Sequence, residues 1–373
     1  MTPSKLNTQA SPFYISLKRS AALCLLISSS LSAAIFSACD DVGQSPLAGV
    51  EVLAGQDGGS EDPEWRTEAE LASEGTVMSV WGTGELVYAV GGQPNAGRVW
   101  SRPISDEAGE GSWTALTGVP DGPLLNWVHG AEGHLWVVGS DGRALRSVEG
   151  GAWESFDSGT TQDLWGVFAV SASEVWAVGG DANGEGDAAP VLIRFDGVQW
   201  SPVPVPELDR SGVRALFKVW GDGAGQVWAV GMKGVIIAEL GEGWTQQQVS
   251  PAEGSPPNAE DLISLWGVNG ELVAVGGRSN GVIARWDGSA WRSQTISGLP
   301  GLNGVWMDPS GTAHAVGVRG SAVTIESGSF EVSRERTYST LVLHAIWSDE
   351  LTRWAVGGTL DNSPPWEGLI LAD

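Results

Sequence analysis

Short apolar runs that close on a Val-Gly pair recur at regular intervals along the chain. The seven copies end at Val90-Gly91, Val138-Gly139, Val178-Gly179, Val230-Gly231, Val275-Gly276, Val316-Gly317 and Val356-Gly357. Their glycines lie 48, 40, 52, 45, 41 and 40 residues apart. A repeat of this length is typical of a β-propeller, in which each copy supplies one four-stranded blade. The pattern therefore predicts an all-β protein with seven blades.

Each repeat contains four strand patterns separated by turn residues. The first reads Leu-x-x-Val-Trp-Gly, as in 216–221, and the second ends in the Val-Gly pair, as in 174–179. The third follows a Gly-rich turn, as in 281–286, and a turn such as Asp287-Gly288 leads to the fourth, which carries an aromatic residue. Asp-Gly between two strand patterns favours an antiparallel hairpin, so we expect four antiparallel strands in each blade.

The seventh repeat ends with its third strand pattern, at 368–373. A matching fourth pattern stands at the other end of the repeat region, where Glu-Trp-Arg-Thr at 64–67 corresponds to Ala-Trp-Arg-Ser at 290–293. We therefore expect the first strand of the propeller to complete the last blade. Such a closure removes the open seam of the ring and ties the two ends of the propeller together.

The N-terminal segment has the pattern of a targeting signal. Lys18 and Arg19 precede an apolar stretch at 21–36, which is shorter than the ~20 residues that span a membrane. The stretch ends in Phe-Ser-Ala-Cys39. This resembles a bacterial lipoprotein signal, and the resemblance implies that residues 1–38 are removed and that Cys39 carries a lipid. An ordinary secretory signal is the alternative.

The lipoprotein resemblance places the protein in a bacterial cell envelope, anchored to a membrane and facing the periplasm or the cell surface. Residues 39–62 are rich in Gly, Ser and Asp, and we expect them to form a flexible tether. Residues 63–373 form the predicted propeller, which contains no cysteine and hence no disulfide.

Charge restricts the possible partners. The chain has 20 basic and 45 acidic residues, which give a formal net charge of −25 at pH 7. Such a charge repels nucleic acid and anionic lipid surfaces, and it also disfavours self-association. We therefore expect a monomer that does not bind nucleic acid and that contacts the membrane through its lipid.

Two phrases, VWAVG and DGxxW, resemble the Trp-rich propeller repeats of bacterial surface lipoproteins. The double glycines at 91–92, 179–180, 276–277 and 357–358 are similar to those of kelch repeats, although the Tyr that kelch repeats place before the turn is absent. The resemblance covers 63–373 and implies the fold. It implies little about activity, because propellers host many unrelated functions.

Few residues of this sequence match the catalytic residues of known propeller enzymes. Sialidase-like enzymes need an arginine triad and a Tyr nucleophile, and galactose-oxidase-like enzymes need a Cys cross-linked to a Tyr. None of the four histidines forms an HxH or HExxH pair, and His129 and His314 occupy aromatic slots of the repeat, where we expect packing. We therefore expect no cofactor and favour a binding module over an enzyme.

A carbohydrate-active enzyme, either a glycoside hydrolase or a lyase, is the alternative. Glycoside hydrolysis needs two carboxylates about 5–10 Å apart. The candidate acids are Asp163, Asp181, Asp187 and Asp261.

One loop has the oxygen ligands that calcium prefers. Asp181, Asn183, Glu185 and Asp187 alternate with small residues, as at the start of a calcium loop. The usual acidic ligand at the twelfth position is replaced by Leu192, so calcium is a possible ligand and a plain solvated loop is the alternative.

Tryptophan gives the best indication of a binding face. Of the 20 tryptophans, Trp100, Trp127, Trp165 and Trp366 fall outside the recurring slots. Trp127 and Trp165 open the first strands of neighbouring repeats, and Trp366 lies in a connection at the same end of the ring. Aromatic faces there suit a sugar ring or a peptide. We therefore predict a binding or scaffolding module for a protein or carbohydrate ligand, with these three residues at its site.

Overall fold

The computed structural model describes residues 65–104, 112–148, 150–184, 188–349, 351–360 and 363–373. Cys39 and the predicted tether lie outside the described residues, as do Glu185 and Asp187. The described chain contains 29 β-strands and three single 3-10 turns, η1 (Ser140–Gly142), η2 (Met232–Gly234) and η3 (Val318–Gly320). None of these turns has the length or the apolar character of a membrane span.

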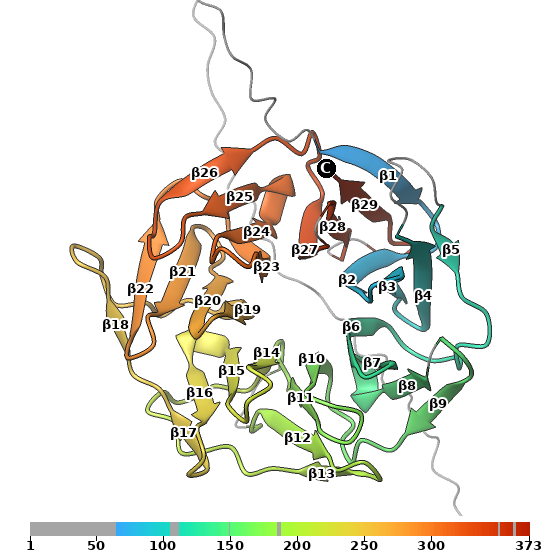
Figure 1. Cartoon of the computed structure of the whole chain (residues 1–373), viewed down its shortest axis with the longest axis horizontal. Coiled ribbons are helices and arrows are strands. Elements are labelled where there is room, and N and C mark those ends of the chain that lie inside the picture. Colours follow the sequence, from blue (N-terminus) through green and yellow to red (C-terminus); the bar gives the residue numbers. More distant parts are fainter. Residues whose placement is uncertain (1–64, 105–111, 149, 185–187, 350, 361–362) are drawn as a thin grey trace, which may run out of the picture. The chain divides into compact units, whose positions relative to one another are not determined.

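The strands form seven sheets that lie as blades round an axis (Figure 1). The innermost strands β2, β6, β10, β14, β19, β23 and β27 span Thr76–Gly82, Leu125–Ala131, Leu164–Ala169, Leu216–Gly221, Leu262–Val268, Leu302–Met307 and Val342–Ser348. The second strands β3, β7, β11, β15, β20, β24 and β28 span Leu86–Gln93, His134–Gly139, Val175–Gly179, Val227–Gly231, Glu271–Gly276, Ala313–Gly317 and Arg353–Gly358.

The outer half of each blade completes the antiparallel sheet. The third strands β4, β8, β12, β16, β21, β25 and β29 span Ala96–Pro103, Ala144–Val148, Val191–Phe195, Ile236–Glu239, Gly281–Trp286, Ala322–Ile325 and Gly368–Ala372. The outer strands β5, β9, β13, β17, β22, β26 and β1 span Thr114–Ala115, Trp153–Phe156, Trp200–Pro202, Trp244–Gln246, Trp291–Ile296, Val332–Glu335 and Arg66–Leu71. The predicted seven-bladed propeller is thus confirmed, with blades numbered here one to seven from β2 onward.

The last blade closes as the sequence predicts. Strand β1 pairs antiparallel with β29, so that Arg66 lies opposite Ala372 and Leu71 opposite Gly368. Blade five differs from the expectation of four strands. A fifth strand, β18 (Val249–Pro251), from the connection that follows blade four, runs parallel to the outer strand β22.

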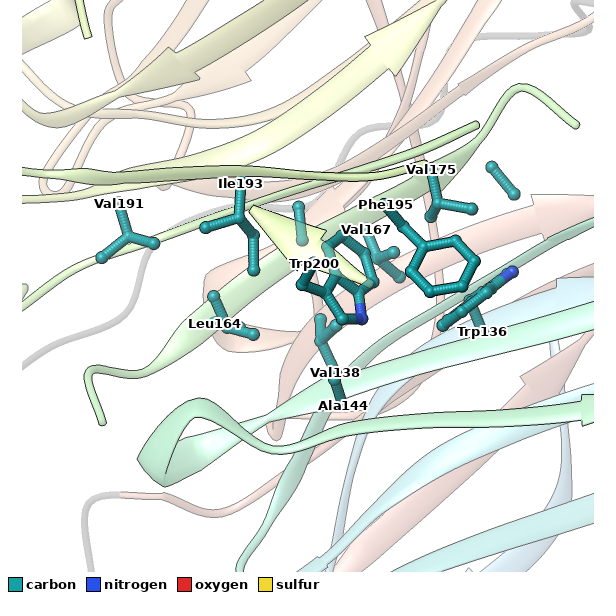
Figure 2. Packing of buried hydrophobic residues seen from close by; sticks show 12 residues of the cluster. Trp136, Val138, Ala144, Leu164, Val167, Val175, Val191, Ile193, Phe195 and Trp200 are labelled. Atoms are coloured by element: carbon teal, nitrogen blue, oxygen red, sulfur yellow. The ribbon is translucent and has the colours of Figure 1, made fainter. Parts of the chain in front are cut away.

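Neighbouring blades are held together by aromatic pairs that explain the Trp repeat. Figure 2 shows one such contact, where Trp200 of blade three lies near Trp136 of blade two. Their ring centroids are 5.5 Å apart in an edge-to-face arrangement, and Trp176 and Trp244 form the corresponding pair between blades three and four at 5.3 Å. The Trp of a second strand therefore packs on the outer-strand Trp of the next blade. Such pairs add about 0.5–1.5 kcal/mol beyond their burial.

Close to the axis, the aromatic residue of one innermost strand packs on the glycine of the next. A Cβ at Gly130 would lie 2.7 Å from the ring of Trp81, and a Cβ at Gly82 would lie 2.2 Å from the ring of Trp347. The second contact joins blade seven to blade one. In these blades the Trp-Gly ending of the first strand pattern therefore exists because the ring of the preceding blade occupies the space that a side chain would need.

Candidate ligand-binding pocket on the propeller axis

Every innermost strand carries a β-bulge at the residue after its first buried Leu or Val. A bulge interrupts the alternation of a strand and re-aims one side chain. The bulged residues, in blade order, are Met78, Asn126, Trp165, Phe217, Ile263, Asn303 and His344. All seven line a single pocket of about 280 Å³. Since they come from all seven blades, this axial pocket lies on the propeller axis.

The axial pocket also contains Trp127 and Lys218, which follow the bulge in blades two and four. In the other blades this position holds a small residue, namely Ser79, Gly166, Ser264, Gly304 or Ala345. Blade three, between the two, has Gly166, so no side chain separates its neighbours there. As a result the Lys218 ammonium lies over the face of the Trp127 ring, where the negative potential of the ring attracts its positive charge.

Lys218 is the single charged residue of the described lining, and it is only 5% exposed. Within the described chain its Nζ has no carboxylate partner and makes no hydrogen bond. Burial lowers the pKa of Lys218 well below its ordinary value, because water no longer stabilises the ammonium. Burial lowers the pKa of His129 to about 3, and the positive charge of Lys218 adds to this shift. An anion in the pocket would therefore stabilise the charged form of Lys218.

Two further polar atoms at the axial pocket are buried without a hydrogen-bond partner in the described protein. One is Oδ1 of Asn126, whose Nδ2 donates to the backbone oxygen of Leu164 at 3.0 Å, and the other is Nε2 of His344. Burial lowers the pKa of His344 to about 4, while a hydrogen bond to the backbone of Gly358 opposes the shift. His344 is therefore neutral at pH 7. Buried polar atoms without partners are uncommon, and in a pocket they indicate where a ligand can bond.

The structure brings together two of the three predicted ligand-binding tryptophans. Trp127 and Trp165 line the axial pocket and are half-buried, and Trp165 Nε1 donates to the backbone oxygen of Gly180 at 3.0 Å. Trp366 is half-buried as well but does not line that pocket; its backbone N–H donates to Oε1 of Gln93 at 2.9 Å. The binding role of all three stays a prediction.

Sequence reasoning missed Lys218, Asn126 and His344. A signal for Lys218 is present in the repeat alignment, because a long cationic side chain occupies a slot that is small in five other blades. The bulge itself leaves no such trace, since bulged residues share no chemistry.

The proposed calcium loop receives no support from the part that is described. Asp181 and Asn183 are visible, whereas the other two ligands lie outside the described residues. Across the described chain, no three His, Cys, Asp or Glu side chains gather as a metal site would need.

Two of the acids considered for an enzyme have a structural role. Asp163 Oδ1 accepts a hydrogen bond from the Asp141 N–H at 3.0 Å, and Asp261 Oδ1 accepts one from the Lys233 N–H at 2.8 Å. Asp141 and Lys233 are the residues with positive φ, 56° and 57°, in the turns η1 and η2 of the preceding blades. Each aspartate therefore holds the backbone of a neighbouring blade in a strained turn.

A larger cleft of about 680 Å³ lies between blades one and two, and its lining includes Trp81, Tyr88, Glu85 and Glu132. Both carboxylates are exposed. This is a wet acidic rim and not the partly buried carboxylate pair that glycoside hydrolysis would place in a cleft.

Comparison with known proteins agrees on the fold. The sequence matches no protein-family model and no curated protein. Among solved structures, the WD40 β-propeller domain of Doa1 superposes with a TM-score of 0.58 and 12% identity, over 82% of this chain and 96% of that one. The YCF48 protein bound to D1 peptide superposes with a TM-score of 0.58 and 15% identity, over 84% of this chain and 97% of that one. YCF48 from Cyanidioschyzon merolae superposes with a TM-score of 0.57 and 14% identity, over 83% of this chain and 98% of that one. The chain is therefore a seven-bladed β-propeller whose fold is that of the WD40 and YCF48 propellers.

Proposed function

We propose that this protein is a lipid-anchored module of a bacterial envelope that binds a protein ligand by taking one short peptide segment into the axial pocket. The observation that carries the proposal is the seven-fold bulge, which directs one side chain from each blade into one pocket. The shape and polarity of the pocket lining therefore vary from blade to blade, as selective recognition of a ligand requires. A volume of about 280 Å³ suits one or two amino-acid side chains.

A peptide is favoured over a glycan by the lining. Met78, Phe217 and Ile263 are apolar, and the face of Trp127 is already covered by Lys218. A sugar needs open aromatic faces and many hydrogen-bond partners, whereas an apolar side chain needs the enclosure that this pocket gives. The YCF48 structure bound to D1 peptide is a precedent for a peptide ligand on this fold.

The pocket is tested with peptides selected from a random library on the purified full-length protein in detergent. We expect Trp165→Ala to weaken binding of the selected peptides at least tenfold, since tryptophans commonly dominate the affinity of an interface. Trp286→Ala, in a half-buried tryptophan of blade five outside the pocket, is the matched control and should change affinity less than twofold. Trp366→Ala measures whether the third predicted tryptophan contributes to binding from outside the pocket. Equal binding by wild type and a folded Trp165→Ala variant would contradict the assignment.

The membrane anchor is tested separately. The lipoprotein-like signal motivates the expectation that Cys39→Ser releases the protein into the soluble fraction of envelope preparations, because the thiol at the predicted lipidation position is then absent. Cys24→Ser, within the signal itself, is the control and should remain with the membrane. Retention of Cys39→Ser in the membrane fraction would show that another feature anchors the protein.

A further inference from the structure

We propose that the axial pocket selects a peptide carboxylate that stands next to an apolar side chain, with Lys218 as the ion-pair partner of the carboxylate. This inference rests on the proposed peptide-binding function and adds the chemistry of the ligand. The observation behind it is the enclosed amine of Lys218, which contacts the Trp127 ring but has no carboxylate partner in the described chain, at the point where side chains from all seven blades meet.

The charge arrangement is unusual for this chain. Acidic residues outnumber basic ones by 45 to 20, yet the described lining of the axial pocket contains no Asp or Glu. A buried ammonium without a counter-ion is unfavourable, and a carboxylate in direct contact removes that cost. The protein therefore lacks, in its own described residues, the partner that Lys218 requires, and a ligand can supply it.

Two polar residues that line the same pocket as Lys218 favour a peptide over a simple carboxylic acid. Oδ1 of Asn126 is a hydrogen-bond acceptor without a partner, and His344 is neutral, with Nε2 unpartnered. A ligand that carries amide N–H groups beside its carboxylate can donate to Asn126, whereas an aliphatic acid offers no donor. The apolar neighbours Trp165, Phe217 and Ile263 can enclose the side chain next to the carboxylate.

The net charge of the protein does not oppose this selection. At physiological ionic strength the Debye length is about 8 Å, so exposed carboxylates beyond that distance have little effect on an anionic ligand that approaches through solvent. His129, which interacts electrostatically with Lys218, and His344, which lines the same pocket, have pKa values lowered to about 3 and about 4 and carry no charge at pH 7. Lys218 is therefore the group that decides the local response to an anion.

The test uses three small probes with the full-length protein in detergent and isothermal titration calorimetry at pH 7. The probes are N-acetyl-Gly-Phe with a free carboxylate, the same compound as its C-terminal amide, and N-acetyl-Asp-Phe amide. We expect the amide of Gly-Phe to bind at least tenfold more weakly than one of the two carboxylates. Tighter binding of N-acetyl-Gly-Phe would show that the pocket prefers a chain terminus, and tighter binding of N-acetyl-Asp-Phe amide would show that it prefers an acidic side chain.

The matched variants are Lys218→Met and Lys233→Met, two lysines of blade four of which only the first lines the pocket. We expect Lys218→Met to lose at least tenfold in affinity for the preferred carboxylate and to unfold at the same or a higher temperature, because it removes an uncompensated buried charge. Lys233→Met should bind as wild type does. This combination separates lost recognition from lost folding.

Two results would overturn the inference. One is a Lys218→Met variant that binds the carboxylate probes as tightly as wild type, and the other is equal or undetectable binding of the acid and amide probes. In either case the effect of Trp165→Ala on the binding of library-selected peptides still tests the proposed function, because that effect does not require a carboxylate in the peptide.

Discussion

Deletion of residues 65–71 should remove most of the stability of the propeller. Strand β1 is the outer strand of blade seven, and it also joins that blade to both neighbours. Trp65, 2% exposed, donates from Nε1 to Glu335 of blade six at 2.7 Å. On the other side, Glu68 pairs with Arg102 of blade one at 3.1 Å and accepts a hydrogen bond from Trp113 at 3.0 Å. Without β1, the ring opens at all of these contacts.

The expected magnitude follows from the buried tryptophan alone. Removal of a buried Trp side chain costs about 3–5 kcal/mol, against a total stability of roughly 5–15 kcal/mol for a domain. We therefore expect the melting temperature to fall by at least ~10 °C or cooperative unfolding to disappear. Deletion of residues 40–55, in the predicted tether, is the control and should leave the transition unchanged. Equal melting temperatures for the two deletions would show that β1 does not close the ring.

Arg353→Met should have the second largest effect. The guanidinium of Arg353 lies between the carboxylates of Glu335 and Asp373, with Nη1 3.0 Å from Glu335 Oε1 and Nε 2.8 Å from Asp373 Oδ2. All three side chains are at most 13% exposed. Removing the cation leaves two enclosed carboxylates without their partner, which costs about 3–5 kcal/mol. Urea denaturation at pH 7 measures the loss.

The effect of Arg353→Met should shrink in acid. Burial by itself would raise the pKa of Glu335, but hydrogen bonds from Arg353, Thr324 and Trp65 outweigh it and hold the pKa below its ordinary value. A carboxyl with a lowered folded-state pKa contributes stability above its unfolded pKa and loses that contribution as pH falls through the folded-state pKa. Wild type should therefore lose stability below about pH 4–5, where the variant loses less.

A surface ion pair provides the comparison. Arg292 lies 2.9 Å from Asp287, and their side chains are 55% and 44% exposed. Arg292→Met should leave the urea midpoint unchanged, because solvent screens such pairs. A similar loss in both arginine variants would mean that the enclosed network around Arg353 has no special role.

The sequence predicted the blades because its periodicity has a direct physical origin. The second-strand Trp136 packs on the outer-strand Trp200 of the next blade, and the first-strand Trp81 packs on Gly130, so contacts between blades produce residues that recur along the sequence. The closing strand was predictable for the same reason, since Trp65 fills an outer-strand slot.

The axial pocket was only partly predictable. Trp127 and Trp165 stood out because they break the repeat, but a bulge is a matter of pairing register and leaves no pattern in single residues. Strand β18 was missed for a related reason, because its parallel pairing with β22 depends on where a long connection lies and not on its apolar pattern.

The most direct test of the account is an experimental structure of the full-length protein in complex with a library-selected peptide. We predict that one peptide side chain will occupy the axial pocket, in contact with Trp165 and with Lys218 on the propeller axis. A peptide seated in the cleft between blades one and two, or along the outer strands, with the axial pocket unchanged, would contradict the central claim.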